Sequence, residues 1–82
     1  MLVVLTERAE AQFTRLPITI KTRVEGIFAR LREWPEVSGA KAMRGDLAGY
    51  YRIRTGDWRV LFRVEGDVIV VRIEHRKEVY ND

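Results

Sequence analysis

The chain has 82 residues, 46% of them hydrophobic, and a formal net charge of +3 from 15 Lys and Arg against 12 Asp and Glu. This length suits one small domain with a single core, here residues 1–82, and no apolar stretch approaches the roughly 18 residues of a membrane span. With no cysteine and one histidine, disulfides, thiolate zinc sites and cysteine nucleophiles are excluded, so we expect no metal or cofactor.

The first half of the chain predicts a short strand followed by two helices. The apolar run Leu2–Leu5 lacks a basic flank and a small-residue cleavage site, which favours a strand over a signal peptide. We therefore expect a cytoplasmic protein. Thr6 is a suitable N-cap for a helix over Glu7–Leu16, and Pro17 ends that helix. A second helix over about Thr19–Glu33 completes an antiparallel helical hairpin.

The second half predicts a meander of strands. The polar, turn-rich segment Glu36–Gly49 is the only long connection. Two tight turns, Gly56-Asp57 and Gly66-Asp67, separate strands expected at Tyr50–Thr55, Trp58–Val64 and Val68–His75. The element order is therefore β-α-α-β-β-β, which predicts an α+β fold with the helical hairpin packed on one face of a small antiparallel sheet.

The two turns predict which residues face each other across the sheet. The first turn places Arg54 opposite Arg59 and Tyr51 opposite Phe62. If Gly66-Asp67 is also a two-residue turn, the pairing register extends to the last strand. It then gives four pairs on the apolar face that covers the helices: Val64–Ile69, Phe62–Val71, Val60–Ile73 and Trp58–His75.

The opposite face holds a cluster of arginines. By the same count it carries Arg52, Arg54, Arg59, Leu61, Arg63, Val70, Arg72, Glu74 and, just past the strand, Arg76. Facing like charges lower the stability of a sheet, so the Arg54–Arg59 pair indicates an anionic partner, and nucleic acid is a common polyanion. For any single arginine, a solvated surface on which Glu74 pairs with Arg59 is the alternative. The predominance of one sign is not typical of an ordinary soluble face.

Four motifs stand out in the second half of the chain: M-R-G at 43–45, G-Y-Y-R-I-R at 49–54, G-D-W-R-V-L-F at 56–62 and H-R-K-E-V-Y at 75–80. Together they resemble the RelE branch of the RelE/ParE toxins of type II toxin–antitoxin systems. The resemblance covers Leu2 to Tyr80. It implies a small curved antiparallel sheet with two N-terminal helices on one face, in agreement with the predicted order.

The resemblance also implies an activity and partners. It implies a metal-independent endoribonuclease that cuts messenger RNA in the ribosomal A site by 2′-hydroxyl attack, and a cognate antitoxin that neutralises it in a complex. By position, the family's functional residues correspond to Arg52, Arg54, Arg59, Arg76 and Tyr80. Arg59 and Arg76 would stabilise transition-state charge, and Tyr80 would stack on a base or act as general base. Further predicted RNA contacts are Lys41, Arg44, Arg63 and Arg72.

One departure from the family leaves the proton transfers open. Some members carry lysine where this chain has Arg52 and Arg54, and arginine is a poor proton shuttle. Lys77 and His75 are possible substitutes, although His75 is expected on the core side. Two other functions stay open: a ParE-like inhibitor of DNA gyrase without nuclease activity, and a catalytically inactive RNA-binding relative.

Overall fold

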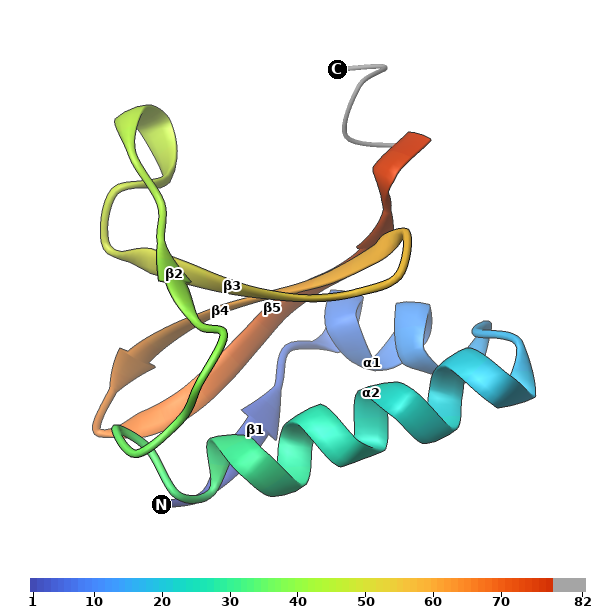
Figure 1. The fold of residues 1–82 in the computed structure, drawn as a ribbon, viewed down its shortest axis with the longest axis horizontal. Helices are drawn as coiled ribbons and strands as arrows, with labels where there is room; N and C mark the ends of the chain where they lie inside the picture. Colours follow the sequence, from blue (N-terminus) through green and yellow to red (C-terminus); the bar gives the residue numbers. More distant parts are fainter. Residues whose placement is uncertain (78–82) are drawn as a thin grey trace.

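The computed structural model describes residues 1–77, which form two layers: a curved five-stranded sheet and two helices that cover one of its faces (Figure 1). The elements in chain order are β1 (Val3–Leu5), α1 (Glu7–Thr14), α2 (Ile18–Leu31), β2 (Lys41–Ala42), the 3₁₀ helix η1 (Gly45–Leu47), β3 (Tyr50–Thr55), β4 (Trp58–Glu65) and β5 (Asp67–His75). The predicted α+β fold, with its helical hairpin on one face, is confirmed.

The strand order is β1-β5-β4-β3-β2. The first strand lies beside the last and runs parallel to it, whereas every other pair is antiparallel, so the sheet is mixed and not purely antiparallel as predicted. The segment predicted as one long connection contains β2, which adds a short outer strand beside β3, and η1.

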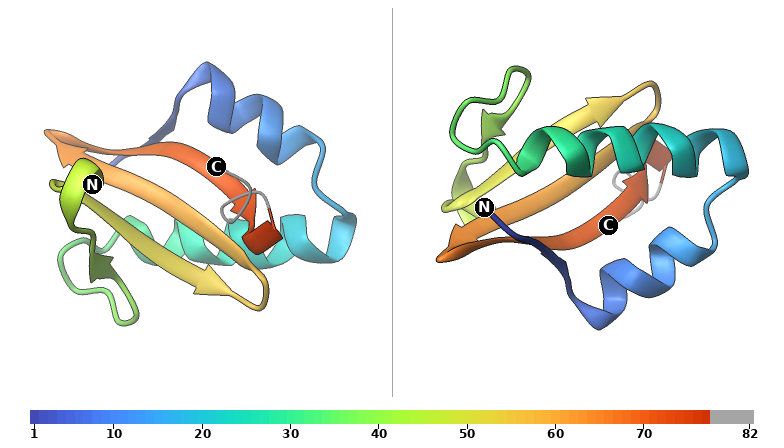
Figure 2. Two further views of the ribbon diagram at one scale, coloured as in Figure 1. Left: turned by 90° about the horizontal axis from the view of Figure 1, so that it is seen from above. Right: turned by 90° about the horizontal axis from the view of Figure 1, so that it is seen from below.

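The helices begin close to where the sequence placed them. The N–H of Ala9 donates to Oγ1 of Thr6 at 3.2 Å, which confirms the predicted N-cap. Both helices end two residues before the predicted position. The helices diverge from their connection (Figure 2), and the rings of Phe13 and Phe28 meet with centroids 5.6 Å apart.

The core lies between the helices and the inner face of the sheet. Its buried members include Val24, Ile27 and Leu31 of α2 and Ile53, Val60, Phe62, Val70 and Ile73 of the sheet. Trp34, just after α2, sets its ring edge-on to Phe62 at 5.4 Å. This apolar packing fixes the orientation of the three long strands, and therefore which of their side chains point outward.

The β3–β4 hairpin has the predicted register. Arg54 faces Arg59, and Tyr51 faces Phe62. Gly56 has φ +58°, whereas no non-glycine residue among those described has a positive φ. That combination fits a two-residue type II′ turn, which needs glycine at its first central position.

The β4–β5 hairpin departs from the predicted register near its turn. The observed pairs are Leu61–Arg72, Phe62–Val70, Arg63–Ile69, Val64–Val68 and Glu65–Asp67. Gly66 alone therefore forms the turn, and Val71 is left without a partner on β4 as a β-bulge. The predicted pairs Phe62–Val71 and Val64–Ile69 are wrong for this reason.

The bulge changes which valine faces the helices. Val70 was predicted on the outward face but is fully buried in the core, whereas Val71 lines a cavity on the outward side. Beyond the bulge, the predicted pairs Val60–Ile73 and Trp58–His75 are confirmed. The bulge thus compensates for the one-residue error in the predicted turn, so Arg72 and Glu74 occupy the positions predicted for them.

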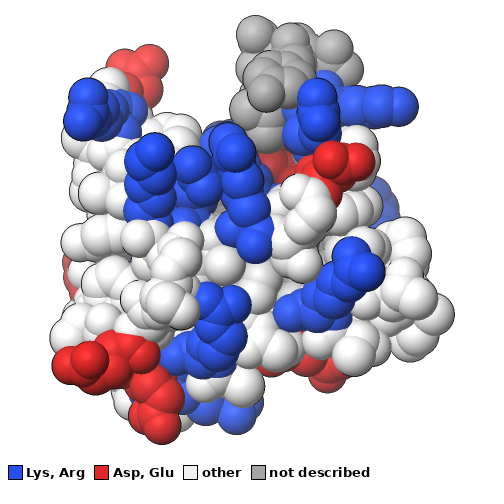
Figure 3. Space-filling model, in the orientation of Figure 1, with Lys and Arg blue, Asp and Glu red and all other residues white. Residues whose placement is uncertain are grey.

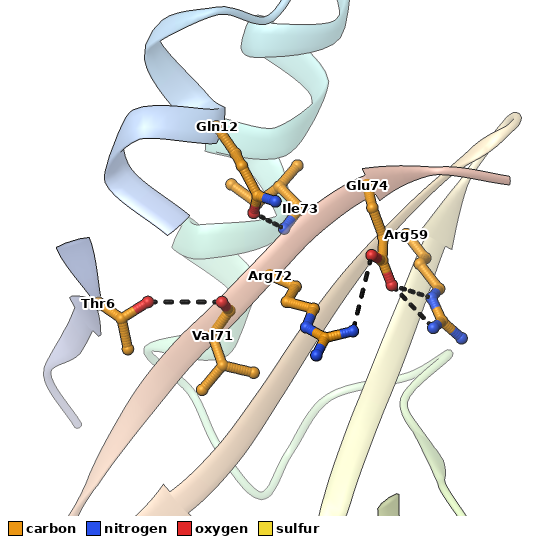
Figure 4. A network of polar contacts seen from close by, with 7 residues as sticks. All are labelled: Thr6, Gln12, Arg59, Val71, Arg72, Ile73 and Glu74. Carbon is orange, nitrogen blue, oxygen red and sulfur yellow. Dashed lines mark hydrogen bonds and ion pairs between the residues drawn. The ribbon is translucent and has the colours of Figure 1, made fainter. Parts of the chain in front are cut away.

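Polar side chains beside α1 complete the edge of β5. Because β1 pairs only with Val68–Val70, the next backbone groups of β5 need other partners. Thr6 Oγ1 donates to the carbonyl of Val71 at 3.4 Å, and Gln12 Oε1 accepts from the N–H of Ile73 at 2.8 Å (Figure 4). These bonds hold in place the strand that carries Arg72 and Glu74.

Candidate functional site

The outward face of the sheet carries three rows of side chains that cross β3, β4 and β5. They are Arg54–Arg59–Glu74, Arg52–Leu61–Arg72 and Tyr50–Arg63–Ile69. Successive rows lie two residues apart along β3 and β4, or about 7 Å, whereas on β5 the bulge sets Arg72 and Ile69 three residues apart. Lys and Arg side chains gather on this side of the molecule (Figure 3). We call the first two rows the arginine face.

Glu74 is the acidic member of the arginine face, and it is buried, with 5% of its side chain exposed. Its Oε1 accepts from Nε of Arg59 at 3.0 Å and from Nη2 at 2.8 Å (Figure 4). Arg72 Nη1 lies 4.0 Å from its other oxygen. The ion pair offered by the sequence as the alternative for Arg59 is therefore present.

This ion pair changes what Arg59 can do. Its side chain is 15% exposed. Because Nε and Nη2 are both bonded to Glu74, the guanidinium plane is fixed, and Nη1, which has no partner within residues 1–77, remains for another acceptor. Arg59 is thus an oriented donor and not a freely moving surface charge.

Arg52 and Arg54 carry positive charge on the arginine face that no acid among residues 1–77 compensates. Within residues 1–77, neither side chain has a hydrogen bond or an ion pair to an acid. Partial burial lowers the pKa of Arg52 from its usual value, and the neighbouring charges of Arg54 and Arg59 lower it further. An arginine stays protonated near neutral pH, so this repulsion favours a bound anion.

Arg76 lies one row beyond the Arg54–Arg59–Glu74 row, level with the β3–β4 turn. Its N–H donates to the carbonyl of Asp57 at 2.8 Å, and its Nη1 lies 3.5 Å from the Asp57 carboxylate. Asp57 belongs to the β3–β4 turn, so these contacts hold the segment after β5 against that turn. The structure therefore places Arg76 next to the row that contains Arg54 and Arg59, two residues further along the strands.

The remaining predicted RNA contacts lie around this centre. Lys41 faces Arg52 from β2, which extends the second row outward, and Arg44 is exposed just before η1. Arg72 belongs to the second row. Arg63 lies in the third row and pairs with Glu65 at 2.5 Å, so part of its charge is already compensated.

The candidates for proton transfer are only partly placed. His75 packs its ring edge-on against Trp58 at 5.1 Å, and its Nδ1 accepts from the N–H of Lys77 at 3.1 Å. The expected core-side position of His75 is confirmed. The side chain of Lys77 is exposed, and Tyr80 lies outside the described residues.

Two features were not assigned a role from the sequence. Glu74 was read only as a possible surface partner, although its register opposite Arg59 already marked it as the one carboxylate within the arginine face. The second feature is a cavity beside Leu61, which depends on η1 folding over the sheet.

No helix within residues 1–77 is long and apolar enough to cross a membrane. In the same range, no group of three or more His, Cys, Asp or Glu could hold a metal ion.

Comparison with known proteins places the chain in a family. Residues 3–80 match the family described as the ParE toxin of type II toxin–antitoxin systems, parDE. Toxin RelG of Mycobacterium tuberculosis is 33% identical over 79 residues, covering 92% of this chain and 90% of RelG.

Solved structures agree with that placement. The toxin–antitoxin complex RelBE2 of M. tuberculosis contains a chain with a TM-score of 0.78 and 27% identity, covering 92% of this chain and 96% of that one. The RelB–RelE complex of Methanococcus jannaschii gives 0.79 and 26%, with 95% of each chain covered. The chain therefore belongs to the ParE toxin family of type II toxin–antitoxin systems, within the RelE/ParE superfamily.

Proposed function

We propose that this toxin is an endoribonuclease that cuts messenger RNA in the ribosomal A site. The observation that best supports this is the uncompensated pair Arg52 and Arg54 beside the oriented donor Arg59. A phosphate backbone supplies the negative charge that such a face lacks. The arrangement combines sites that bind the backbone with a fixed donor for a reacting phosphate.

The proposed reaction needs no group beyond the RNA and side chains. The ribose 2′-oxygen bonds to the adjacent phosphorus while the bond to the 5′-oxygen breaks, which leaves a 2′,3′-cyclic phosphate and a 5′-hydroxyl. One proton leaves the 2′-hydroxyl, and one reaches the 5′-oxygen. Arg59 and Arg76 would meet the charge on the non-bridging oxygens. Since arginine does not exchange protons, we assign those transfers to Tyr80 and Lys77.

The proposal includes partners. The RelBE2 and M. jannaschii RelB–RelE structures are toxin–antitoxin complexes, which supports a cognate antitoxin for this chain. The ribosome and its messenger RNA are the proposed targets, which places the action in the cytoplasm, with no cofactor and no membrane.

Mapping of cut sites tests this function. After brief expression, primer extension on a translated reporter messenger should show cuts positioned by codons, and a matched messenger without a start codon should stay intact. Loss of supercoiling in a plasmid, with an intact messenger, would instead indicate a ParE-like gyrase inhibitor. If neither substrate changes, the protein is a binding relative without nuclease activity.

Glu74 should act as a positioning residue for Arg59. In Glu74→Gln one neutral oxygen replaces the carboxylate, so both bonds to Arg59 weaken while the face gains positive charge. We expect single-turnover cleavage at saturating ribosome to fall about tenfold, the effect of roughly 1.4 kcal/mol. Ribosome affinity should stay equal or increase.

Glu65→Gln is the matched control, because Glu65 pairs with Arg63 but is 70% exposed. It should change neither quantity appreciably. If Glu74→Gln cleaves at the parental rate, Glu74 only stabilises the fold.

Binding to ribosomes should depend on salt through Arg54. Replacing Arg54 with alanine removes one phosphate contact, and the log–log slope of affinity against salt concentration should flatten by roughly one unit. Arg15→Ala, at the end of α1, is the control and should leave the slope unchanged. Salt-independent binding of the parent protein would contradict a phosphate-binding face.

A further inference from the structure

A cavity of about 310 Å³ opens on the outward side of the sheet. Leu61 and Val71 contribute its lining from the sheet, and Leu47 and Tyr50 contribute from η1 and the start of β3. The cavity is distinct from the Arg59–Glu74 ion pair but adjoins it, because Arg72 both lines the cavity and approaches Glu74.

The cavity exists because η1 folds back over the outer face of the sheet. Gly45 and Gly49 flank this turn with φ +66° and +93°, a backbone region that other residues rarely adopt. As a result Leu61, which points away from the core, is only 1% exposed. Leu61 is thus almost fully covered, and the accessible apolar lining of the cavity comes from the partly buried Leu47, Tyr50 and Val71.

The lining combines the groups that hold a nucleobase. Leu47 and Val71 offer an apolar surface beside the covered Leu61, and Tyr50 adds an aromatic ring. Besides Arg72, two charged side chains line the cavity, Arg8 and Asp46. Within the described part of the chain, the side chains of Arg8 and Asp46 form no hydrogen bond and no ion pair. The Asp46 carboxylate only accepts hydrogen bonds, so it suits a base edge that presents adjacent N–H donors.

The position of the cavity relates it to the RNA path. Leu61 lies between Arg52 and Arg72 in the second row, one row from Arg59. The rows of Arg59 and Arg52 are about 7 Å apart. If the reacting phosphate of the RNA lies at Arg59 and the next phosphate lies near Arg52, the nucleotide between them is at the level of the cavity.

We propose that this cavity is a base pocket that binds a guanine of the messenger beside the cut. Asp46 accepts from the two donors of the guanine Watson–Crick edge, N1–H and the N2 amino group, while Tyr50 and Val71 contact the ring. The proposal rests on the proposed function for the source of the base, and it makes Asp46 a specificity-determining residue.

Nucleotide titration of the purified full chain tests the pocket without requiring cleavage. GMP, AMP, CMP and UMP are added separately, and the methyl NMR signals of Leu47, Leu61 and Val71 are followed. GMP should shift these signals at the lowest concentration, and Asp46→Asn should remove its advantage over AMP. If no nucleotide shifts these methyl signals, or if all four shift them equally, the pocket is overturned.

Cut-site mapping then tests the role of the pocket in cleavage. The parent protein should favour sites with guanine beside the cut by roughly 5- to 150-fold, the range for a bidentate base contact, and Asp46→Asn should lose that preference while still cleaving. Asp67→Asn, at the β4–β5 turn and outside the cavity, should keep the parental profile.

The two proposals fail in different ways. A parent protein that binds GMP at the pocket but cuts no messenger overturns the nuclease function and leaves the pocket supported. A parent protein that cuts with the same profile as Asp46→Asn overturns the pocket and leaves the nuclease supported.

Discussion

Arg59→Lys should lower single-turnover cleavage about 10²- to 10³-fold, the loss typical of one preorganised donor to transition-state charge. Lysine keeps a cation opposite Glu74, so the buried carboxylate stays paired and the protein should remain folded. Lysine lacks the planar guanidinium group, whose Nε and Nη2 both bond to Glu74 while Nη1 is held in a fixed orientation. Quench-flow cleavage at saturating ribosome measures the effect, and circular dichroism confirms folding.

The choice of substitution follows from the burial of Glu74. Arg59→Ala would leave a carboxylate with 5% of its side chain exposed and only Arg72 nearby, at 4.0 Å. Loss of one partner of a buried pair costs about 3–5 kcal/mol, so an inactive alanine variant would not distinguish catalysis from folding. Arg15→Lys, on the helical side, is the control for the lysine substitution. Parental cleavage by Arg59→Lys would make the Arg59–Glu74 pair a purely structural element.

Tyr80→Phe separates proton transfer from base stacking. The hydroxyl is needed if Tyr80 is the general base, and its removal should then lower single-turnover cleavage about 10²- to 10⁴-fold. The ring alone supports stacking, worth about 1–3 kcal/mol per base, which phenylalanine retains. Because the arginines cannot take up a proton, we expect a loss in Tyr80→Phe and a larger one in Tyr80→Ala.

The opposite pattern would reassign the base. If Tyr80→Phe cleaves at the parental rate and Tyr80→Ala does not, the tyrosine only positions a nucleotide. Lys77 would then be tested next through Lys77→Met, because its side chain is exposed. His75 is the weaker candidate, since its ring packs on Trp58 and its Nδ1 already accepts a hydrogen bond.

Local sequence signals predicted most of the fold. The first hairpin was predicted correctly because Gly56-Asp57 fixes a two-residue turn and alternation then sets every pair. The predicted register of the second hairpin was wrong near its turn, because a single residue, Gly66, forms the turn in place of the predicted two. The bulge at Val71 then restores the predicted pairing further along the strands. Bulges and the parallel placement of β1 depend on tertiary contacts, such as those of Thr6 and Gln12 with β5, which have no local signature.

The candidate site was predictable as a set of positions but not as a set of contacts. Period-2 alternation placed Arg52, Arg54 and Arg59 on one face, as the structure has them. Alternation gives no measure of burial, so it could not show that Glu74 is buried and orients Arg59. The cavity beside Leu61 was missed because it depends on η1, a segment whose path depends on glycine conformations.

The pairing of β1 with β5 also bears on when the protein becomes active. Thr6 and Val71, which this pairing brings together, are 65 residues apart in the sequence. A contact of such long range closes a loop that spans most of the chain, and during synthesis the N-terminal part emerges first. The last strand also carries Arg72 and Glu74. We therefore expect the arginine face to assemble only after β5 has emerged from the ribosome, so that no earlier part of the nascent chain carries the complete face.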